Sequence, residues 1–221
     1  MPTPRTLPQL IVLVVALAAA GCAGRAASSQ ADAPPSPPVR PLSLLAAQRI
    51  VVAPVHSVAE GDPLGWAAGI PRQRDWMREL DGAIGVELGA RGLGNTWVHT
   101  ETLARAYERN PTLSPDPYRL AAEPLQRLTR ISEERLPDPL ASQLRTLVAV
   151  HDARFVLLPV RVSFERAGEA GGRAVLRLAL LDARAAEVRW LGDVRSDGFS
   201  TFNPEVAVSL AARLADLIAA P

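Results

Sequence analysis

The chain has 221 residues, with 24 basic residues against 23 acidic ones and a formal net charge of +1. Every basic residue is arginine, so this chain has no lysine for a Schiff base or a phosphate-binding P-loop. The balanced charge argues against nucleic-acid binding, for which a concentrated basic surface is typical.

The amino terminus has the three parts of a signal peptide over residues 1–21. Arg5 lies near the free amine, residues 10–20 form an unbroken apolar run, and small residues directly precede the only cysteine, Cys22. The apolar run is shorter than the roughly 20 residues that span a bilayer, which favours a secretion signal over a membrane helix.

The segment Ala19-Ala20-Gly21-Cys22 resembles the bacterial lipobox, although leucine is more usual at the position of Ala19. The resemblance implies a diacylglycerol on the Cys22 thiol and an acylated amino terminus. The alternative is an ordinary signal peptide cut near Ala20, which leaves Cys22 as a free thiol. By the same resemblance, Ala23 in place of aspartate implies delivery to the outer membrane, with the chain on its periplasmic face.

Residues 22–45 are expected to form a disordered tether, because proline, alanine and serine predominate there and no apolar period is present. The remaining stretch, 46–221, has a length that suits a single globular domain.

An apolar, β-branched run at 49–55 predicts a buried strand, and a glycine- and proline-containing loop at 56–71 follows it. The next element is a predicted helix, with Arg74 and Arg78 among the charged residues on its solvent side. Its apolar stripe consists of Trp76, Leu80, Ile84 and Leu88. Its glycines, which we expect to permit close approach to a sheet, are Gly82, Gly85 and Gly89. Residues 95–98 indicate a short second strand.

The middle of the chain, 100–150, is predicted to be mainly helical. Thr100 is expected to cap a helix at 101–109, and a second helix is expected around 125–131. Asp138 and Pro139 predict a third helix, with aspartate as its cap and proline as its first residue. The buried stripe of that helix is Leu140, Leu144, Leu147 and Val148.

Three runs, 154–164, 173–181 and 187–194, predict an antiparallel meander with one face wetter than the other. A closing helix begins after Asn203-Pro204. Its inner stripe is Val206, Leu210, Leu214, Leu217 and Ile218. The predicted order is β-α-β-α-β-β-β-α, a single α/β sandwich with a mixed sheet of about five strands.

Four segments carry a further resemblance: the strand 50–55, the strand entry 151–159, the strand-turn-strand pattern 181–190 and the helix 204–219. They resemble a family of envelope lipoproteins that includes the curli-secretion lipoprotein, the lipoprotein activator of penicillin-binding proteins and the amino-terminal domain of the Tol periplasmic protein. Pro159 departs from the glycine that the family usually has. The resemblance implies an α/β envelope domain over most of 47–219.

Candidate chemistry is sparse. His56, His99 and His151 are far apart and lie in no metal-binding motif, so neither a metal nor a cofactor is expected. Residues 198–202 hold only the first half of a G-x-S-x-G nucleophile motif. Enzymatic activity is therefore not predicted.

The loop at 56–71 is the remaining candidate for a site, because open α/β sheets often bind ligands beyond the end of a strand. The candidate partner-binding residues are His56, Asp62 and Trp66. Tryptophan is enriched at binding hot spots, but Trp66 can also fold back onto the sheet, and packing is the preferred interpretation.

Taken together, these features favour a non-catalytic binding or assembly module that is anchored in the outer membrane and binds another envelope protein. The alternative is a periplasmic carrier of a small ligand or lipid, which requires a sizeable apolar pocket. A cryptic hydrolase is the third hypothesis.

Overall fold

The computed structural model of the chain describes residues 40–131, 135–168 and 171–220. The predicted signal peptide, Cys22 and the part of the predicted tether before Arg40 lie outside the described residues. Within the described ranges, no helix is both long enough and apolar enough to cross a membrane.

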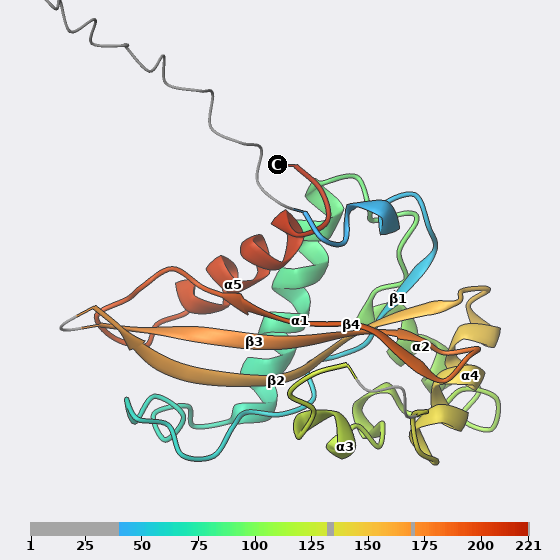
Figure 1. The fold of residues 1–221 in the computed structure, drawn as a ribbon, viewed down its shortest axis with the longest axis horizontal. Coiled ribbons are helices and arrows are strands. Elements are labelled where there is room, and N and C mark those ends of the chain that lie inside the picture. The colour runs from blue at the N-terminus through green and yellow to red at the C-terminus, as the bar shows by residue number, and fades with distance from the viewer. Residues whose placement is uncertain (1–39, 132–134, 169–170, 221) are drawn as a thin grey trace, which may run out of the picture. The chain divides into compact units, whose positions relative to one another are not determined.

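A four-stranded mixed sheet forms the centre of the domain (Figure 1). Its strands, in spatial as well as sequence order, are β1 (Ile50–Val52), β2 (Phe155–Ala167), β3 (Gly171–Asp182) and β4 (Glu187–Arg195). β1 is parallel to β2, and the other neighbours are antiparallel. The α/β class, the mixed sheet and the carboxy-terminal meander are therefore confirmed.

The predicted strand at 95–98 is reduced to one bridge. Val52 N donates to Val98 O at 2.8 Å and Val98 N donates to Ile50 O at 2.8 Å. The preceding residues cannot extend this pairing, because the amides of Thr96 and Trp97 both donate to Leu93 O in a turn. The described sheet thus has four strands instead of about five.

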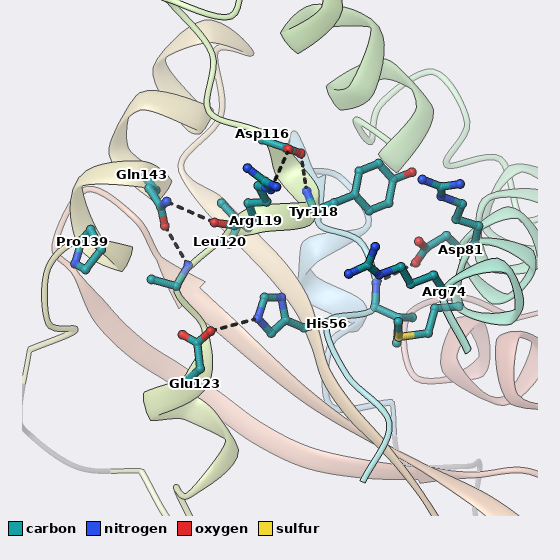
Figure 2. Close-up of a pocket in the computed structure, with 14 residues that line it drawn as sticks. His56, Arg74, Asp81, Asp116, Tyr118, Arg119, Leu120, Glu123, Pro139 and Gln143 are labelled. Carbon is teal, nitrogen blue, oxygen red and sulfur yellow. Dashed lines mark hydrogen bonds and ion pairs between the residues drawn. The ribbon is translucent and has the colours of Figure 1, made fainter. Parts of the chain in front are cut away.

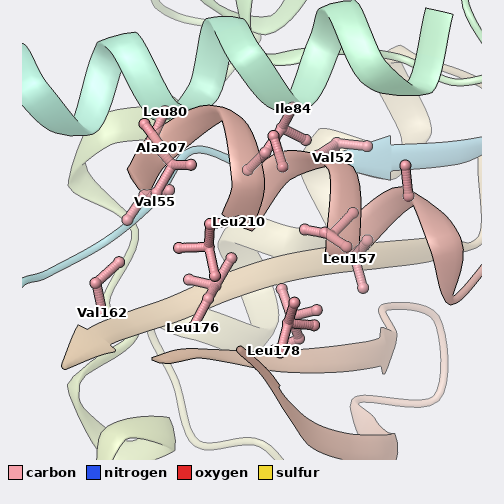
Figure 3. Close-up of a cluster of buried hydrophobic side chains, with 14 of the residues drawn as sticks. Val52, Val55, Leu80, Ile84, Leu157, Val162, Leu176, Leu178, Ala207 and Leu210 are labelled. Atoms are coloured by element: carbon pink, nitrogen blue, oxygen red, sulfur yellow. The ribbon is translucent and has the colours of Figure 1, made fainter. Parts of the chain in front are cut away.

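Two helices cover one face of the sheet, α1 (Gln73–Ala90) and α5 (Glu205–Asp216). The four-residue stripe predicted for α1 is buried, from Trp76 to Leu88. Figure 3 shows Leu80 of α1 beside Ala207 of α5, and Leu210 of α5 above Leu176 of β3. This close packing of aliphatic side chains is the main apolar core of the domain.

The opposite face is covered as well, by α2 (Thr100–Arg109), η2 (Pro117–Arg119), α3 (Glu123–Gln126) and α4 (Leu140–Val150). Ala179 and Leu181 of β3 are fully buried beneath this layer, together with Leu144 of α4. The prediction of one wetter face is therefore wrong, because the helical middle of the chain folds over it.

Several helix boundaries differ from those predicted. Thr100 is the first residue of α2 instead of its cap, and its hydroxyl donates to Val52 O at 3.4 Å. α4 begins one residue later than predicted, although Asp138 Oδ1 still accepts from Ser142 N at 3.0 Å. The helix expected around 125–131 is the single turn α3.

The glycines of α1 do not approach the sheet. A Cβ atom added at Gly82, Gly85 or Gly89 would meet nothing within 4 Å. These three residues lie on the open side of the helix, so the predicted close approach is wrong.

The domain begins before residue 46. Leu42, the residue before the short helix η1 (Ser43–Leu45), and Leu45, its last residue, are buried in the main core, and Leu42 N donates to Leu217 O at 3.1 Å. The boundary predicted at residue 45 is therefore too late, because two leucines of the proposed tether bury their side chains on the domain.

Candidate functional site

A cleft of about 730 Å³ lies beyond the carboxyl end of β1 (Figure 2). One wall is α1, and the opposite wall is the segment from η2 through α3 to the start of α4. The floor is formed by Val55 and His56. Residues 53–59 continue alongside β2 after β1 ends, and His56 N donates to Pro159 O at 3.0 Å, which fixes the floor to the sheet.

The wall formed by α1 is a second stripe of side chains, separate from the apolar stripe that α1 buries in the core. Arg74, Met77, Arg78 and Asp81 line the cleft at spacings of three and four residues. Such residues share one face of a helix. The apolar stripe that starts at Trp76 points to the sheet, so one helix holds the core on one side and forms the cleft on another.

Asp81 is the most perturbed group in the cleft. Its side chain belongs to a residue that is only 9% exposed, and its Oδ1 accepts from Val55 N at 2.7 Å. Its Oδ2 is buried and has no hydrogen-bond partner among the described residues. Burial raises the pKa of Asp81 to about 7, against the opposing effects of the Val55 hydrogen bond and the Arg78 charge. The carboxyl therefore exchanges its proton near neutral pH.

Hydrogen bonds to the backbone hold the opposite wall in place. Asp116 Oδ1 accepts from Tyr118 N at 2.9 Å. Gln143 Oε1 accepts from Ala121 N at 2.8 Å, and its Nε2 donates to Arg119 O at 3.3 Å. The Arg78 guanidinium lies 5.5 Å from the centre of the Tyr118 ring, so a cation–π contact joins the two walls.

His56 and Glu123 form the remaining polar pair of the cleft. His56 Nε2 lies 3.9 Å from Glu123 Oε1, beyond hydrogen-bond distance. Burial lowers the pKa of His56, and the nearby Glu123 carboxylate only partly offsets that effect. At any pH above this lowered pKa, the His56 imidazole on the cleft floor is neutral.

The structure separates the three loop residues singled out from the sequence. His56 lines the cleft, but Asp62 and Trp66 do not. The Asp62 carboxylate stabilises its own loop, accepting from Leu64 N at 2.8 Å and Ala67 N at 2.6 Å.

Trp66 is a core residue. It is 9% exposed, and its ring centre lies 5.7 Å from that of Phe164 and 5.8 Å from that of Phe202. The packing interpretation is correct, and the interpretation of Trp66 as an exposed anchor is wrong.

Sequence reasoning did not identify Asp81 or Tyr118 as cleft residues. The sequence did contain one indication of the cleft, because Asp81 directly follows Leu80 within the apolar stripe of a predicted helix. A carboxylate at that position is either exposed at the edge of the stripe or buried with a hydrogen-bond partner.

The described residues contain no group of three or more histidine, cysteine, aspartate or glutamate side chains that could hold a metal ion. The cleft lining also lacks a serine, threonine, cysteine or lysine side chain, the usual nucleophiles of covalent catalysis. Its arrangement of arginines, carboxyls and an amide suits hydrogen-bonded recognition.

Comparison with known proteins gives distant structural similarity only. No model of a known protein family matches the sequence, and no curated protein matches it. Among solved structures, the PelC dodecamer from Paraburkholderia phytofirmans is 15% identical, with a TM-score of 0.40 and coverage of 79% of this chain and 91% of that chain.

Two further structures are similar to a comparable degree. Lipoprotein GNA1162 from Neisseria meningitidis is 11% identical, with a TM-score of 0.35 and coverage of 76% of this chain and 96% of that one. LpoB of E. coli is 15% identical, with a TM-score of 0.34 and coverage of 90% and 84%. Values this low assign neither a family nor a function.

Proposed function

We propose that the chain is an envelope lipoprotein, held at the periplasmic face of the outer membrane by lipid on Cys22, whose domain binds another envelope protein without catalysis. The cleft between α1 and η2–α3 carries the binding part of this proposal. The sequence of residues 1–22 carries the anchoring part.

Binding is favoured over catalysis because of the groups that the cleft presents. Arg74 and Arg78 line the cleft with guanidinium donors that a partner can engage, whereas Asp116 and Gln143 are engaged with backbone amides. No serine, threonine, cysteine or lysine side chain lines this cleft beside His56. The site can therefore hold a polar segment, and it lacks the hydroxyl, thiol and amine nucleophiles of serine, threonine, cysteine and lysine.

A lipid carrier fits the cleft less well. Its volume, about 730 Å³, is within the range of small-ligand pockets. Its lining, however, includes six aspartate, glutamate or arginine side chains: Arg74, Arg78, Asp81, Asp116, Arg119 and Glu123. An acyl chain would have to desolvate these charges, which is unfavourable without pairing.

The anchor is tested by intact-mass analysis of membrane-fraction protein, wild type against Cys22→Ser. We expect a mature chain that begins at Cys22 and carries a lipid-sized mass increment, which is absent from the variant. An unmodified wild-type chain in the soluble fraction would contradict the anchor.

The binding face is tested by photo-crosslinking in cells. A photoreactive amino acid replaces Arg119, on the exposed rim of the cleft, and the control replaces Val208, which is 53% exposed on α5. We expect position 119 to crosslink a specific envelope protein and position 208 to give none of that product. Equal products from both positions, or none from either, would refute a partner at the cleft.

A further inference from the structure

We infer that the cleft contains a carboxylate-binding subsite, formed by Arg74, Arg78 and Asp81, which takes an acidic group of the bound partner protein. This inference rests on the proposed function, because it names the chemistry by which the same cleft recognises its partner.

The first observation is the free oxygen of Asp81. Oδ2 belongs to a residue that is 9% exposed, and it has no hydrogen-bond partner among the described residues. Buried polar atoms in folded proteins are nearly always paired. Because Asp81 lines the cleft, a ligand group that reaches this buried oxygen would supply its missing hydrogen-bond partner.

The second observation is that two guanidinium groups on the same wall keep their donors available. Arg74 pairs with no carboxylate among the described residues. The nearest carboxylate of Arg78 is Asp75, whose Oδ1 lies 3.9 Å from Nη1, beyond hydrogen-bond distance. Figure 2 shows Arg74 and Asp81 on the same side of the cleft. Guanidinium groups bind carboxylates through paired N–H donors, and two of them on one helix face form a suitable receptor.

The third observation is the distribution of charge across the cleft. On the opposite wall, Arg119 Nε lies 3.9 Å from Asp116 Oδ2, so these two charges offset each other. Glu123 adds a negative charge on that side, near His56. An anionic group is therefore attracted to the α1 wall and repelled from the α3 side, which orients the bound segment.

Protonation of Asp81 supports the same geometry. When Oδ2 carries a proton, it donates a short hydrogen bond to a carboxylate; when it is ionised, it repels one. Because burial raises the pKa of Asp81 to about 7, binding should weaken as pH rises through neutrality. The other titratable or charged groups around Asp81 are Arg74 and Arg78 on α1, His56 after β1, His99 and Glu101 at α2, and Asp116 and Tyr118 at η2.

The test uses the full mature chain in detergent micelles and three pentapeptides that differ only in their acidic groups. One has a central glutamate and blocked ends, one has a central glutamine and a free carboxyl terminus, and one has a central glutamine and blocked ends. Binding is followed by the NMR shifts of the arginine Nε–Hε groups. We expect at least one acidic peptide to bind, and the neutral peptide to bind at least tenfold more weakly.

The two acidic peptides distinguish the source of the carboxylate. Binding of the glutamate peptide assigns an acidic side chain of the partner, and binding of the other assigns its chain terminus. Arg74→Gln and Arg78→Gln should each weaken binding about tenfold. The control Arg72→Gln, on an 83% exposed side chain outside the cleft, should leave binding unchanged.

The variant Asp81→Asn distinguishes the contribution of Asp81 to the pH dependence of binding from those of His56 and His99. Wild-type affinity should fall about tenfold from pH 6 to pH 8, as the protonated fraction of a group with a pKa near 7 does. The asparagine amide donates at both pH values, so the variant should keep its affinity. A pH dependence that persists in Asp81→Asn removes Asp81 from the subsite.

The subsite is wrong if neither acidic peptide binds better than the neutral one, or if Arg72→Gln weakens binding as much as Arg74→Gln. Inorganic phosphate that binds through Arg74 when both acidic peptides fail would also overturn the carboxylate assignment. If crosslinking from position 119 still finds an envelope partner in any of these three cases, the proposed function stands and only this inference fails.

Discussion

Replacing Asp81 with asparagine tests the main electrostatic feature of the domain. Asparagine has nearly the same shape, and its side-chain oxygen can still accept from Val55 N, as Asp81 Oδ1 does at 2.7 Å. The substitution removes the ionisation of a side chain whose residue is only 9% exposed. It therefore isolates the free energy of placing a negative charge at this position.

The expected size of the effect follows from the pKa of Asp81, which rises from 3.8 to about 7 on folding. Between these values the folded chain binds the proton more tightly than the unfolded chain, so the contribution to stability is complete below pH 3.8 and disappears as pH rises through 7. Each pKa unit corresponds to about 1.4 kcal/mol. From pH 5 to pH 8, the wild type should therefore lose roughly 3 kcal/mol of unfolding free energy relative to Asp81→Asn.

The assay is urea unfolding of both proteins at pH 5 and pH 8, followed by tryptophan fluorescence. Burial lowers the pKa values of His56, His99 and His151, which makes stability rise with pH and opposes the effect of Asp81 in the wild type. The difference between the two proteins largely cancels these contributions. If the difference in unfolding free energy between wild type and Asp81→Asn is the same at pH 5 and pH 8 within about 0.5 kcal/mol, a strongly raised pKa for Asp81 is refuted.

Three further predictions concern stability and are checked by the same unfolding measurements. Gly85→Ala should stabilise the protein by up to about 1 kcal/mol, because the added methyl group meets open space in a helix interior; destabilisation would reveal a close contact there. Leu210→Ala and Leu144→Ala, one from each side of the sheet, should each cost about 2–5 kcal/mol, and a negligible cost for Leu144 would show that the second layer does not fold with the first. Trp66→Ala should cost about 3–5 kcal/mol and leave crosslinking from position 119 intact in the folded protein, whereas a surface anchor would show the opposite pattern.

Local pattern was sufficient to predict much of the fold. The recurrence of apolar residues every three or four positions located α1 and α5 and identified which of their faces would be buried, including Leu80 and Leu210. Strand-like runs separated by the turn at 182–186 located the β3–β4 hairpin. These features depend on interactions within one element or between neighbouring elements, so the sequence alone contains the information.

Features that depend on contacts between distant segments were not predictable in the same way. The sheet face expected to be wetter is covered, because Leu144 and its neighbours fold over it from the middle of the chain. Leu42 is buried in the main core and its amide donates to Leu217 O, directly after α5, although its own segment has no apolar period. Trp66 joins Phe164 and Phe202 from two other regions of the chain.

The cleft depends most strongly on tertiary structure. The sequence of α1 places Arg74, Arg78 and Asp81 on one helix face, but it does not say what lies opposite that face. Asp81 is buried against Val55, which lies 26 residues earlier and supplies an amide donor, and η2 forms the opposite wall of the cleft. A periodic pattern identifies the apolar side of an element, whereas the pKa of a polar side chain depends on the solvent and charges that the rest of the fold leaves around it.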